Sequence, residues 1–186
     1  AFLYGDDKQE EIVEMPFLID VYPVTNAQYA KFIEAGGYRN ARYWSDEGWA
    51  WREEENRSEP EYWNDKKWNP PEHPVVGVSW YEADAFARWA GKRLPTEKAW
   101  ERAARGTDGR EYPWGDAFDP EKCNTNESKI GKTTRVTRYP SGISPAGCYD
   151  MAGNVWEWTE TQEGDKKVLR GGSWGFNRES ARCASR

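Results

Sequence analysis

Few residues in this chain are of the types that carry out catalysis. There is one histidine, His73, and there are three cysteines, Cys123, Cys148 and Cys183. A Ser/His/Asp grouping would depend on that single imidazole, and the sequence contains neither a glycine-rich phosphate loop nor a Cys/His cluster with metal-ligand spacing. His73 precedes a proline and is expected to make a structural hydrogen bond, while Cys183 is expected to be a buried small hydrophobe. The sequence leaves open whether Cys123 and Cys148 pair.

The C-terminal segment LRGGSWGFNRESARCASR (169–186) suits binding better than catalysis. Its Gly-Gly-Ser-Trp turn precedes mixed aromatic and polar side chains, which a rigid scaffold of ordered loops can present to a partner at low entropic cost. The alternative is that its tryptophans pack in the core, and we favour this for Trp158 and Trp174. The candidate contact residues are Trp174, Phe176, Asn177, Arg178, Glu179 and Ser185, joined by Trp156.

The elements that must position these residues are mainly helices in the first part of the chain and short strands and loops in the second part. MPFLIDVYPV (15–24) alternates apolar and polar residues and predicts a strand. Helices are predicted within 25–37, 79–93 and 94–106. In each of these segments a Ser or Thr that can cap the helix precedes a stripe of apolar residues, and a glycine follows the stripe. After Gly106, turn residues recur and only short strands such as TRVTRYP, VWEWT and KVLRGGSW are expected. The sequence therefore predicts an α+β domain with little regular secondary structure.

Residues 38–72 form an aromatic and charged insertion with no persistent helical or strand period. Its length exceeds that of ordinary connections, so it is either a functional loop or a disordered one. Disordered segments are poor in aromatic residues, and this insertion contains many, so an ordered loop is the better interpretation.

Composition sets further bounds. The chain has 186 residues, a formal net charge of −6, a pI of about 5.1 and a mean hydropathy of −1.04. This acidic balance argues against a nucleic-acid partner. The sequence contains no run of about 18 apolar residues, so membrane insertion is not expected. The opening AFLYGDDKQEE lacks the pattern of a signal peptide, so a cytoplasmic location is slightly favoured although the compartment stays unknown. One domain spanning 1–186 is expected.

Five ordered motifs carry a resemblance that covers nearly the whole chain. They lie at 22–32, 73–106, 112–116 (YPWGD), 149–159 (YDMAGNVWEWT) and 169–174 (LRGGSW). In this order they resemble the formylglycine-generating enzyme, or sulfatase-modifying factor, domain family. The resemblance implies a C-type-lectin-like fold with structural calcium. That family usually continues with a closing strand after the position of Arg186, and this strand is expected to be missing here.

The resemblance implies two calcium sites. Asp150, Gly153, Val155 and Glu157 match positions where two carboxylates and two main-chain carbonyls bind one ion, in keeping with the oxygen ligands that Ca²⁺ prefers. From spacing alone, the same pattern would be two solvated acids beside a turn. Asn124, Thr125, Ser128 and Ile130 match a second site, in which Ser128 replaces a carboxylate that Glu127 could supply. A hydrogen-bonded loop without metal is an equal alternative there.

The resemblance also identifies what this chain lacks. The family's oxidases bind copper through two cysteines after Gly-Gly-Ser-Trp, and these positions match Phe176 and either Arg178 or Ala181. A second enzymatic branch holds iron with three histidines, which this chain cannot supply. Neither copper nor iron is expected, because soft-metal and redox chemistry need thiolates or several imidazoles. The protein is therefore predicted not to be an enzyme.

The same scaffold occurs in variable proteins of diversity-generating retroelements, in which C-terminal Asn-type codons are rewritten. Gly175, Phe176, Asn177, Ser180 and Ser185 occupy such places. The predicted function is a non-catalytic ligand-binding protein with a C-terminal surface for a protein or other macromolecular ligand. The alternative is a formylglycine-generating or related oxidase or modifying enzyme with an altered active site.

Overall fold

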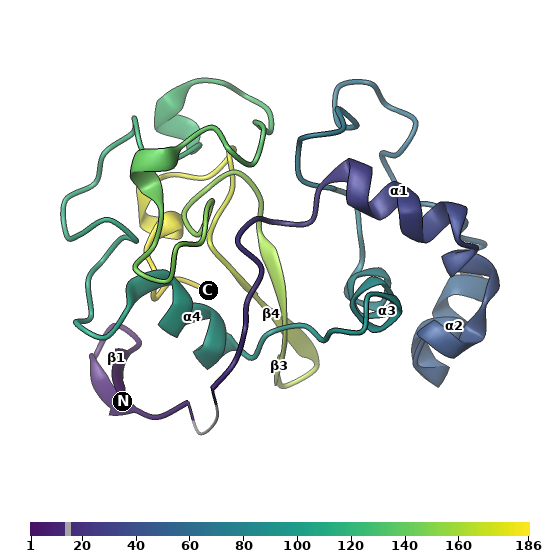
Figure 1. Cartoon of the computed structure of the whole chain (residues 1–186), viewed down its shortest axis with the longest axis horizontal. Coiled ribbons are helices and arrows are strands. Elements are labelled where there is room, and N and C mark those ends of the chain that lie inside the picture. Colours follow the sequence, from purple (N-terminus) through teal and green to yellow (C-terminus); the bar gives the residue numbers. More distant parts are fainter. Residues whose placement is uncertain (14–15) are drawn as a thin grey trace. The chain divides into compact units, whose positions relative to one another are not determined.

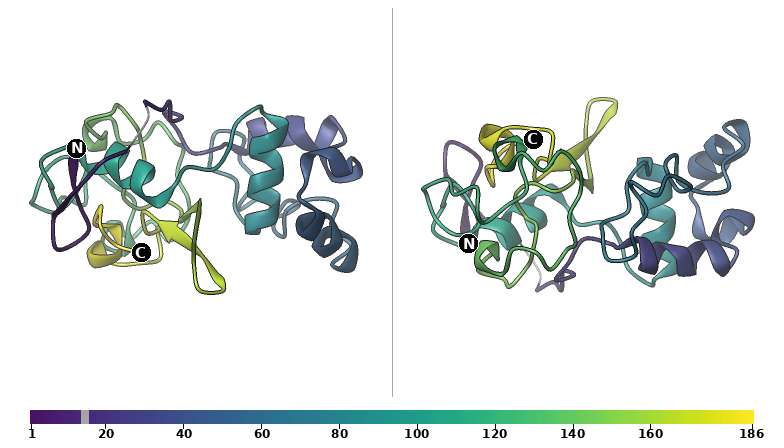
Figure 2. Two further views of the ribbon diagram at one scale, coloured as in Figure 1. Left: turned by 90° about the horizontal axis from the view of Figure 1, so that it is seen from below. Right: turned by 90° about the horizontal axis from the view of Figure 1, so that it is seen from above.

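The computed structural model describes residues 1–13 and 16–186, and these form two compact units. The loop-rich unit comprises Ala1–Pro23 and Pro95–Arg186, and the helical unit comprises Val24–Leu94 (Figures 1 and 2). The helices of both units and the short strands of the loop-rich unit are joined by long irregular segments, so the α+β, loop-rich prediction is confirmed. That all 186 residues form one domain stays a prediction.

The loop-rich unit contains two short hairpins and one helix. Strands β1 (Phe2–Tyr4) and β2 (Gln9–Glu11) pair antiparallel, as do β3 (Glu157–Glu163) and β4 (Lys166–Arg170). Helix α4 (Glu97–Arg105) contacts β1, β3 and β4. The other regular elements among the described residues of this unit are the 3₁₀ turns η3 (Asn126–Ser128), η4 (Pro140–Gly142) and η5 (Arg178–Ala181).

The helical unit consists of α1 (Asn26–Glu34), α2 (Asp46–Glu54) and α3 (Trp80–Trp89), with 3₁₀ turns η1 (Gly37–Arg39) and η2 (Ala41–Tyr43). The predicted helices at 25–37, 79–93 and 94–106 are confirmed as α1, α3 and α4. Thr25 and Ser79 both make the expected capping boxes, in which the cap side chain and the side chain three residues later satisfy each other's main-chain amides.

Three expectations about local structure were wrong. The predicted strand at 15–24 is absent over residues 16–24, while Met15 lies outside the described residues. Phe17 and Ile19 do pack inward while Leu18 is fully exposed, but this alternation has no neighbouring strand to pair with. No strand forms in TRVTRYP (134–140). The insertion at 38–72 contains helix α2, which Ser45 caps through a hydrogen bond from the Gly48 amide.

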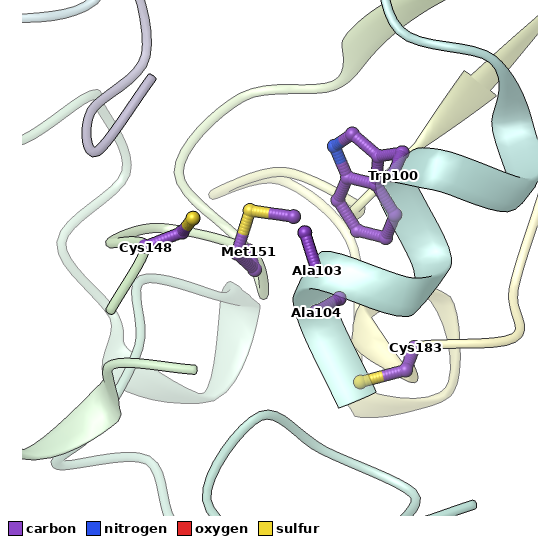
Figure 3. Close-up of a cluster of buried hydrophobic side chains, with 6 residues drawn as sticks. All are labelled: Trp100, Ala103, Ala104, Cys148, Met151 and Cys183. Atoms are coloured by element: carbon purple, nitrogen blue, oxygen red, sulfur yellow. The ribbon is translucent and has the colours of Figure 1, made fainter. Parts of the chain in front are cut away.

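The core of the loop-rich unit packs around the inner face of α4. Figure 3 shows Met151 and the two alanines of α4 beside the Trp100 ring, with Cys183 next to Ala104. Cys183 is fully buried, as expected. All three cysteines are free thiols; Cys148 belongs to this core, whereas Cys123 packs with Ala152 and Ala181 in a separate cluster.

A buried ionic network lies beside this core. Glu101 of α4 binds Arg105 at 2.7 Å and also binds Arg170 of β4, and all three side chains are at most 1% exposed. Arg170 donates further to the carbonyl oxygens of Cys183 at 2.7 Å and Ala184 at 3.0 Å. The network therefore connects α4 and β4 to the chain's C-terminal segment through charge-assisted hydrogen bonds.

The core of the helical unit is aromatic. Its buried members are Tyr29, Phe32, Tyr38, Trp44 and Ala85, and they are surrounded by partly buried tryptophans and tyrosines of the insertion. The one buried carboxylate described in this unit, Glu82, accepts hydrogen bonds from the Tyr38 hydroxyl at 2.6 Å and from the Ser79 amide at 2.7 Å.

Candidate functional site

The loop from Asp150 to Glu157 has a backbone that few sequences could adopt. Asp150, Gly153 and Asn154 all have positive φ, at 55°, 81° and 65°. A Cβ atom on Gly153 would lie 2.3 Å from the carbonyl oxygen of Asn124, so only glycine fits there. The loop is thus pressed against residue 124, with which Gly153 forms a parallel β-bridge.

Two carboxyl groups in this loop are shielded from water, because Asp150 is buried and Glu157 is partly buried. Burial raises the pKa of Asp150 to about 8, an effect that the Glu157 charge adds to and the Asn154 side chain opposes. Burial likewise raises the pKa of Glu157 to about 7, although the Trp100 indole donates to its carboxylate at 2.8 Å. Each raised pKa means that the protein itself stabilises the ionised carboxylate poorly.

These groups fit a calcium ion. Asp150 Oδ1 is buried and accepts no hydrogen bond, while Oδ2 accepts from Asn154 Nδ2 at 2.8 Å. An unpartnered carboxylate oxygen beside a second desolvated carboxylate is a donor arrangement that a hard divalent cation satisfies. The carbonyls of Gly153 and Val155 remain the predicted main-chain ligands, and calcium itself stays a prediction.

The second predicted calcium set contains no carboxylate, and its one comparable feature is the neutral Thr125 Oγ1, which is buried without a hydrogen-bond partner. Ser128 Oγ lies 2.7 Å from the Thr125 carbonyl oxygen and 3.1 Å from Asn124 Oδ1, so its single hydroxyl proton is shared between these two acceptors. The nearby Glu127 is engaged elsewhere, because it accepts from the Arg178 amide at 2.8 Å. Asn124, Thr125, Ser128 and Ile130 thus form a neutral, hydrogen-bonded loop as arranged here, and a metal there stays a prediction without structural support.

Asn154 is a structural hub that sequence reasoning did not single out. Its fully buried side chain forms hydrogen bonds with both main-chain groups of Thr134, with the side-chain amide of Asn124 and with the Asp150 carboxylate. Its own main chain binds the Asn124 carbonyl at 2.7 Å and the Trp174 amide at 3.1 Å. The only sequence signal was an Asn directly after a glycine, a pair that tolerates positive φ.

The predicted contact residues gather at one exposed loop, residues 174–179. Gly175, Phe176, Asn177, Arg178 and Glu179 are exposed, whereas Trp174 is partly buried. The Phe176 ring is 50% exposed and lies 5.4 Å from the Trp156 ring in a T-shaped arrangement, so Trp156 supports it from beneath.

The rest of the predicted surface is adjacent but less exposed. Ser180 and Ser185 are partly buried, and Ser185 Oγ donates to the Glu179 carbonyl at 2.6 Å. The Arg178 and Glu179 side chains form an ion pair at 3.3 Å and both remain mostly in solvent. This part of the loop therefore offers one cation, one anion and an aromatic ring to a partner.

The region contains no reactive thiol among the described residues. Burial raises the pKa of Cys183 to about 12 and that of Cys123 to about 12, and it also raises the pKa of Cys148. Such thiols stay protonated near neutral pH and are poor nucleophiles and metal ligands. Within residues 1–13 and 16–186 no three His, Cys, Asp or Glu side chains come together as a metal-binding group.

Comparison with known proteins gives the family. Residues 2–186 match the sulfatase-modifying factor enzyme 1-like domain. A hercynine oxygenase of Mycolicibacterium thermoresistibile is 36% identical over 93% of this chain, and the inactive C-alpha-formylglycine-generating enzyme 2 of Bos taurus is 35% identical over 91% of it. The alignments span 47% and 69% of those two proteins, so the chain covers about half the length of its oxygenase relative.

Solved structures share the fold. Treponema denticola variable protein 1 has a TM-score of 0.53 and 22% identity, covering 62% of this chain and 65% of its own. CarF has a TM-score of 0.58 and 22% identity, covering 86% and 76%. The predicted C-type-lectin-like, formylglycine-generating-enzyme-like fold is confirmed. No helix in the described part of the chain is long and apolar enough to cross a membrane.

Proposed function

This chain belongs to the sulfatase-modifying factor enzyme 1-like domain family, and we propose that it is a non-catalytic member that binds a macromolecular ligand through the 174–179 loop and Trp156. The proposed ligand is a protein or another macromolecule other than nucleic acid, because the chain's net charge is −6. A display protein diversified within this loop is the form of the proposal that the retroelement resemblance favours.

One observation carries the proposal. Where the resemblance implies the first copper-binding cysteine, the chain has Phe176, a half-exposed phenyl ring seated on Trp156. Supported aromatic rings exposed on ordered loops are the usual anchors of binding surfaces. The other candidate positions for the pair hold an exposed arginine, Arg178, and a buried alanine, Ala181.

Calcium has a structural role in this proposal. Bound by Asp150 and Glu157, the ion would supply the positive charge that these buried carboxylates lack. The same loop holds the Trp174 amide through the Asn154 carbonyl at 3.1 Å. The residues of the calcium loop thus help to fix the start of the 174–179 loop.

Photo-crosslinking tests the proposed surface. Phe176 would be replaced by p-benzoylphenylalanine, a close analogue, and the protein irradiated in extract of its native host. Tyr62, a 44% exposed aromatic residue of the helical unit, is the matched control site. We expect a discrete crosslinked partner from position 176 that is absent from position 62 and is competed away by unlabelled protein. The same products from both positions, or none at 176, would count against the proposal.

The oxygenase relatives favour a second candidate function, an oxidase or related modifying enzyme with an altered site. Oxygen uptake measured with added copper and cysteine-containing peptides, and with added iron and hercynine, separates the two. The proposal expects uptake equal to that of a buffer blank. Turnover that depends on the protein and on either metal would overturn the non-catalytic assignment.

A further inference from the structure

We infer that Glu127, together with the main chain of Asn126, is a clamp that fixes the backbone of the 174–179 loop independently of the side chains the loop carries. Glu127 is thus a positioning residue for the surface. The biological use of the clamp rests on the proposed function, but its existence does not.

Two hydrogen bonds make the clamp, and they lie on either side of Asn177. The Asn126 amide donates to the Phe176 carbonyl at 2.8 Å, and the Arg178 amide donates to Glu127 Oε1 at 2.8 Å. A third bond, from the Phe176 amide to the Ser173 carbonyl at 3.0 Å, closes the turn before them. Both main-chain groups of Phe176 are therefore held, and the peptide on the far side of Asn177 is held as well.

The clamp engages only main-chain atoms of the loop. The side chains of the loop make other contacts: Phe176 rests on Trp156, and Arg178 pairs with Glu179. Replacement of these side chains removes neither clamp bond, because every residue except proline supplies the same amide and every residue supplies the same carbonyl. The loop can therefore change its side chains while its backbone keeps one conformation, which lowers the entropic cost of binding.

The base of the clamp is itself anchored in the loop-rich unit. The Asn124 carbonyl accepts from the Asn154 amide at 2.7 Å, and Asn124 Nδ2 donates to the Lys132 carbonyl at 2.9 Å. Asn124 and Thr125 are both fully buried, whereas Asn126 and Glu127 emerge at the surface. The segment thus leads from a rigid interior directly to the two groups that hold the loop.

Amide hydrogen exchange measured by NMR on the free protein tests the clamp without a ligand. Glu127→Ala removes the acceptor, whereas Glu127→Gln keeps an oxygen in the same place. Glu121→Ala removes an exposed carboxylate from the same region and is the control for charge alone. The Gly153 amide, bonded to the Gly171 carbonyl at 2.7 Å, is the internal reference for unfolding of the unit.

We expect exchange of the Arg178 amide to rise at least about fivefold in Glu127→Ala, to stay within about twofold of wild type in Glu127→Gln, and to be unchanged in Glu121→Ala. The Gly153 amide should keep its rate throughout. Unchanged exchange in Glu127→Ala would overturn the clamp, and so would a Gln variant that exchanges as fast as the Ala variant or an equal rise at Gly153.

A second variant tests the independence from side chains. The triple variant Phe176→Ala, Asn177→Ala, Arg178→Ala should keep the wild-type protection of the amide at position 178, to within about threefold, even though the proposed contact side chains are gone. Full loss of protection would show that the side chains hold the loop and would refute the clamp. Protection without any crosslinked partner at position 176 would leave the clamp standing and count against the proposed function alone.

Discussion

The two units of this protein bury different kinds of side chain. Among the described residues, twelve buried polar or charged residues lie in the loop-rich unit and two lie in the helical unit. The helical unit instead buries a cluster of aromatic rings. The difference follows from the backbone, because capped helices satisfy their own amides and carbonyls, whereas irregular segments do not.

In the loop-rich unit, buried side chains take the place of secondary structure. Arg105 alone donates to the main-chain carbonyls of Gly5, Gly109 and Arg110. Arg170 and Asn154 hold other loop carbonyls and amides in the same way. A fold with little sheet or helix therefore depends on a few long polar side chains, each of which satisfies several main-chain groups at once.

Among the variants that test this difference between the units, replacement of Arg170 by methionine should lower the stability most. It leaves Glu101 without one buried cation and strips two carbonyls of their donor, so we expect a loss of about 3–5 kcal/mol in the free energy of unfolding. Arg186→Met is the control, because Arg186 binds Glu97 at 3.5 Å from a half-exposed position and should cost less than about 0.5 kcal/mol. Urea denaturation measures both, and equal losses would contradict the interpretation.

Asn154→Gly should lower the free energy of unfolding by about 3 kcal/mol, because it too leaves buried main-chain groups without partners. Glycine accepts the φ of 65°, so the loss reports the side-chain hydrogen bonds to Thr134, Asn124 and Asp150 rather than backbone strain. Asn56→Gly in the helical unit is the matched control: it has a similar φ of 50°, is exposed, and should be neutral within about 0.5 kcal/mol. Similar melting temperatures for the two variants would remove the special role of Asn154.

The pH dependence of stability tests the calcium loop. The pKa of Asp150 lies near 8 and that of Glu157 near 7, above their ordinary values of 3.8 and 4.5, because both are desolvated. Between about pH 4 and pH 8 the folded protein therefore holds more protons than the unfolded chain. Each group that takes up a proton in this range adds at most about 1.4 kcal/mol per pH unit, so the calcium-free protein should become more stable as the pH falls from 8 to 6.

Calcium should reverse this pattern. The ion stabilises the ionised carboxylates, so millimolar calcium should raise the melting temperature more at pH 8 than at pH 6, and EGTA should abolish the difference. Asp150→Asn should weaken both the calcium response and the pH slope, which separates this site from the other carboxylates of the chain. A melting temperature that is indifferent to EGTA at pH 8 would remove the proposed metal.

The sequence predicted the helical elements well and the loop-rich networks poorly. Thr25 and Ser79 allow their helices to be predicted, because all the residues of a capping box lie within four positions of the sequence. The strand expected at 15–24 failed because a strand needs a partner elsewhere, and alternation at Phe17 and Ile19 cannot supply one. Asn154 escaped notice because all its side-chain partners except Asp150 lie twenty or more residues away.

The calcium loop came from motif resemblance, whereas the contact surface was predicted from the aromatic and polar residues of the C-terminal segment and supported by the resemblance. Exposure of residues 175–179 agrees with the predicted surface, although it tests no binding. Glu127 was considered only as a substitute calcium ligand, and its hydrogen bond to the Arg178 amide spans 51 residues. No local pattern signals such a contact, because a surface glutamate followed by a serine is compatible with many structures.

The smallest loss of stability is expected in the helical unit, where the buried Glu82 carboxylate and its hydroxyl partners lie within the aromatic core. Tyr38→Phe keeps the ring and removes the hydroxyl that donates to Glu82 at 2.6 Å and lies 3.0 Å from the Tyr29 hydroxyl. Glu82 keeps the Ser79 amide as a donor, so the loss should be about 1–2 kcal/mol, well below that of Arg170→Met. Tyr62→Phe, at a 44% exposed position, is the control and should be neutral. If Tyr38→Phe cost as much as Arg170→Met in the same urea series, the helical unit would depend on its buried polar group as strongly as the loop-rich unit does, and the contrast between the two would fail.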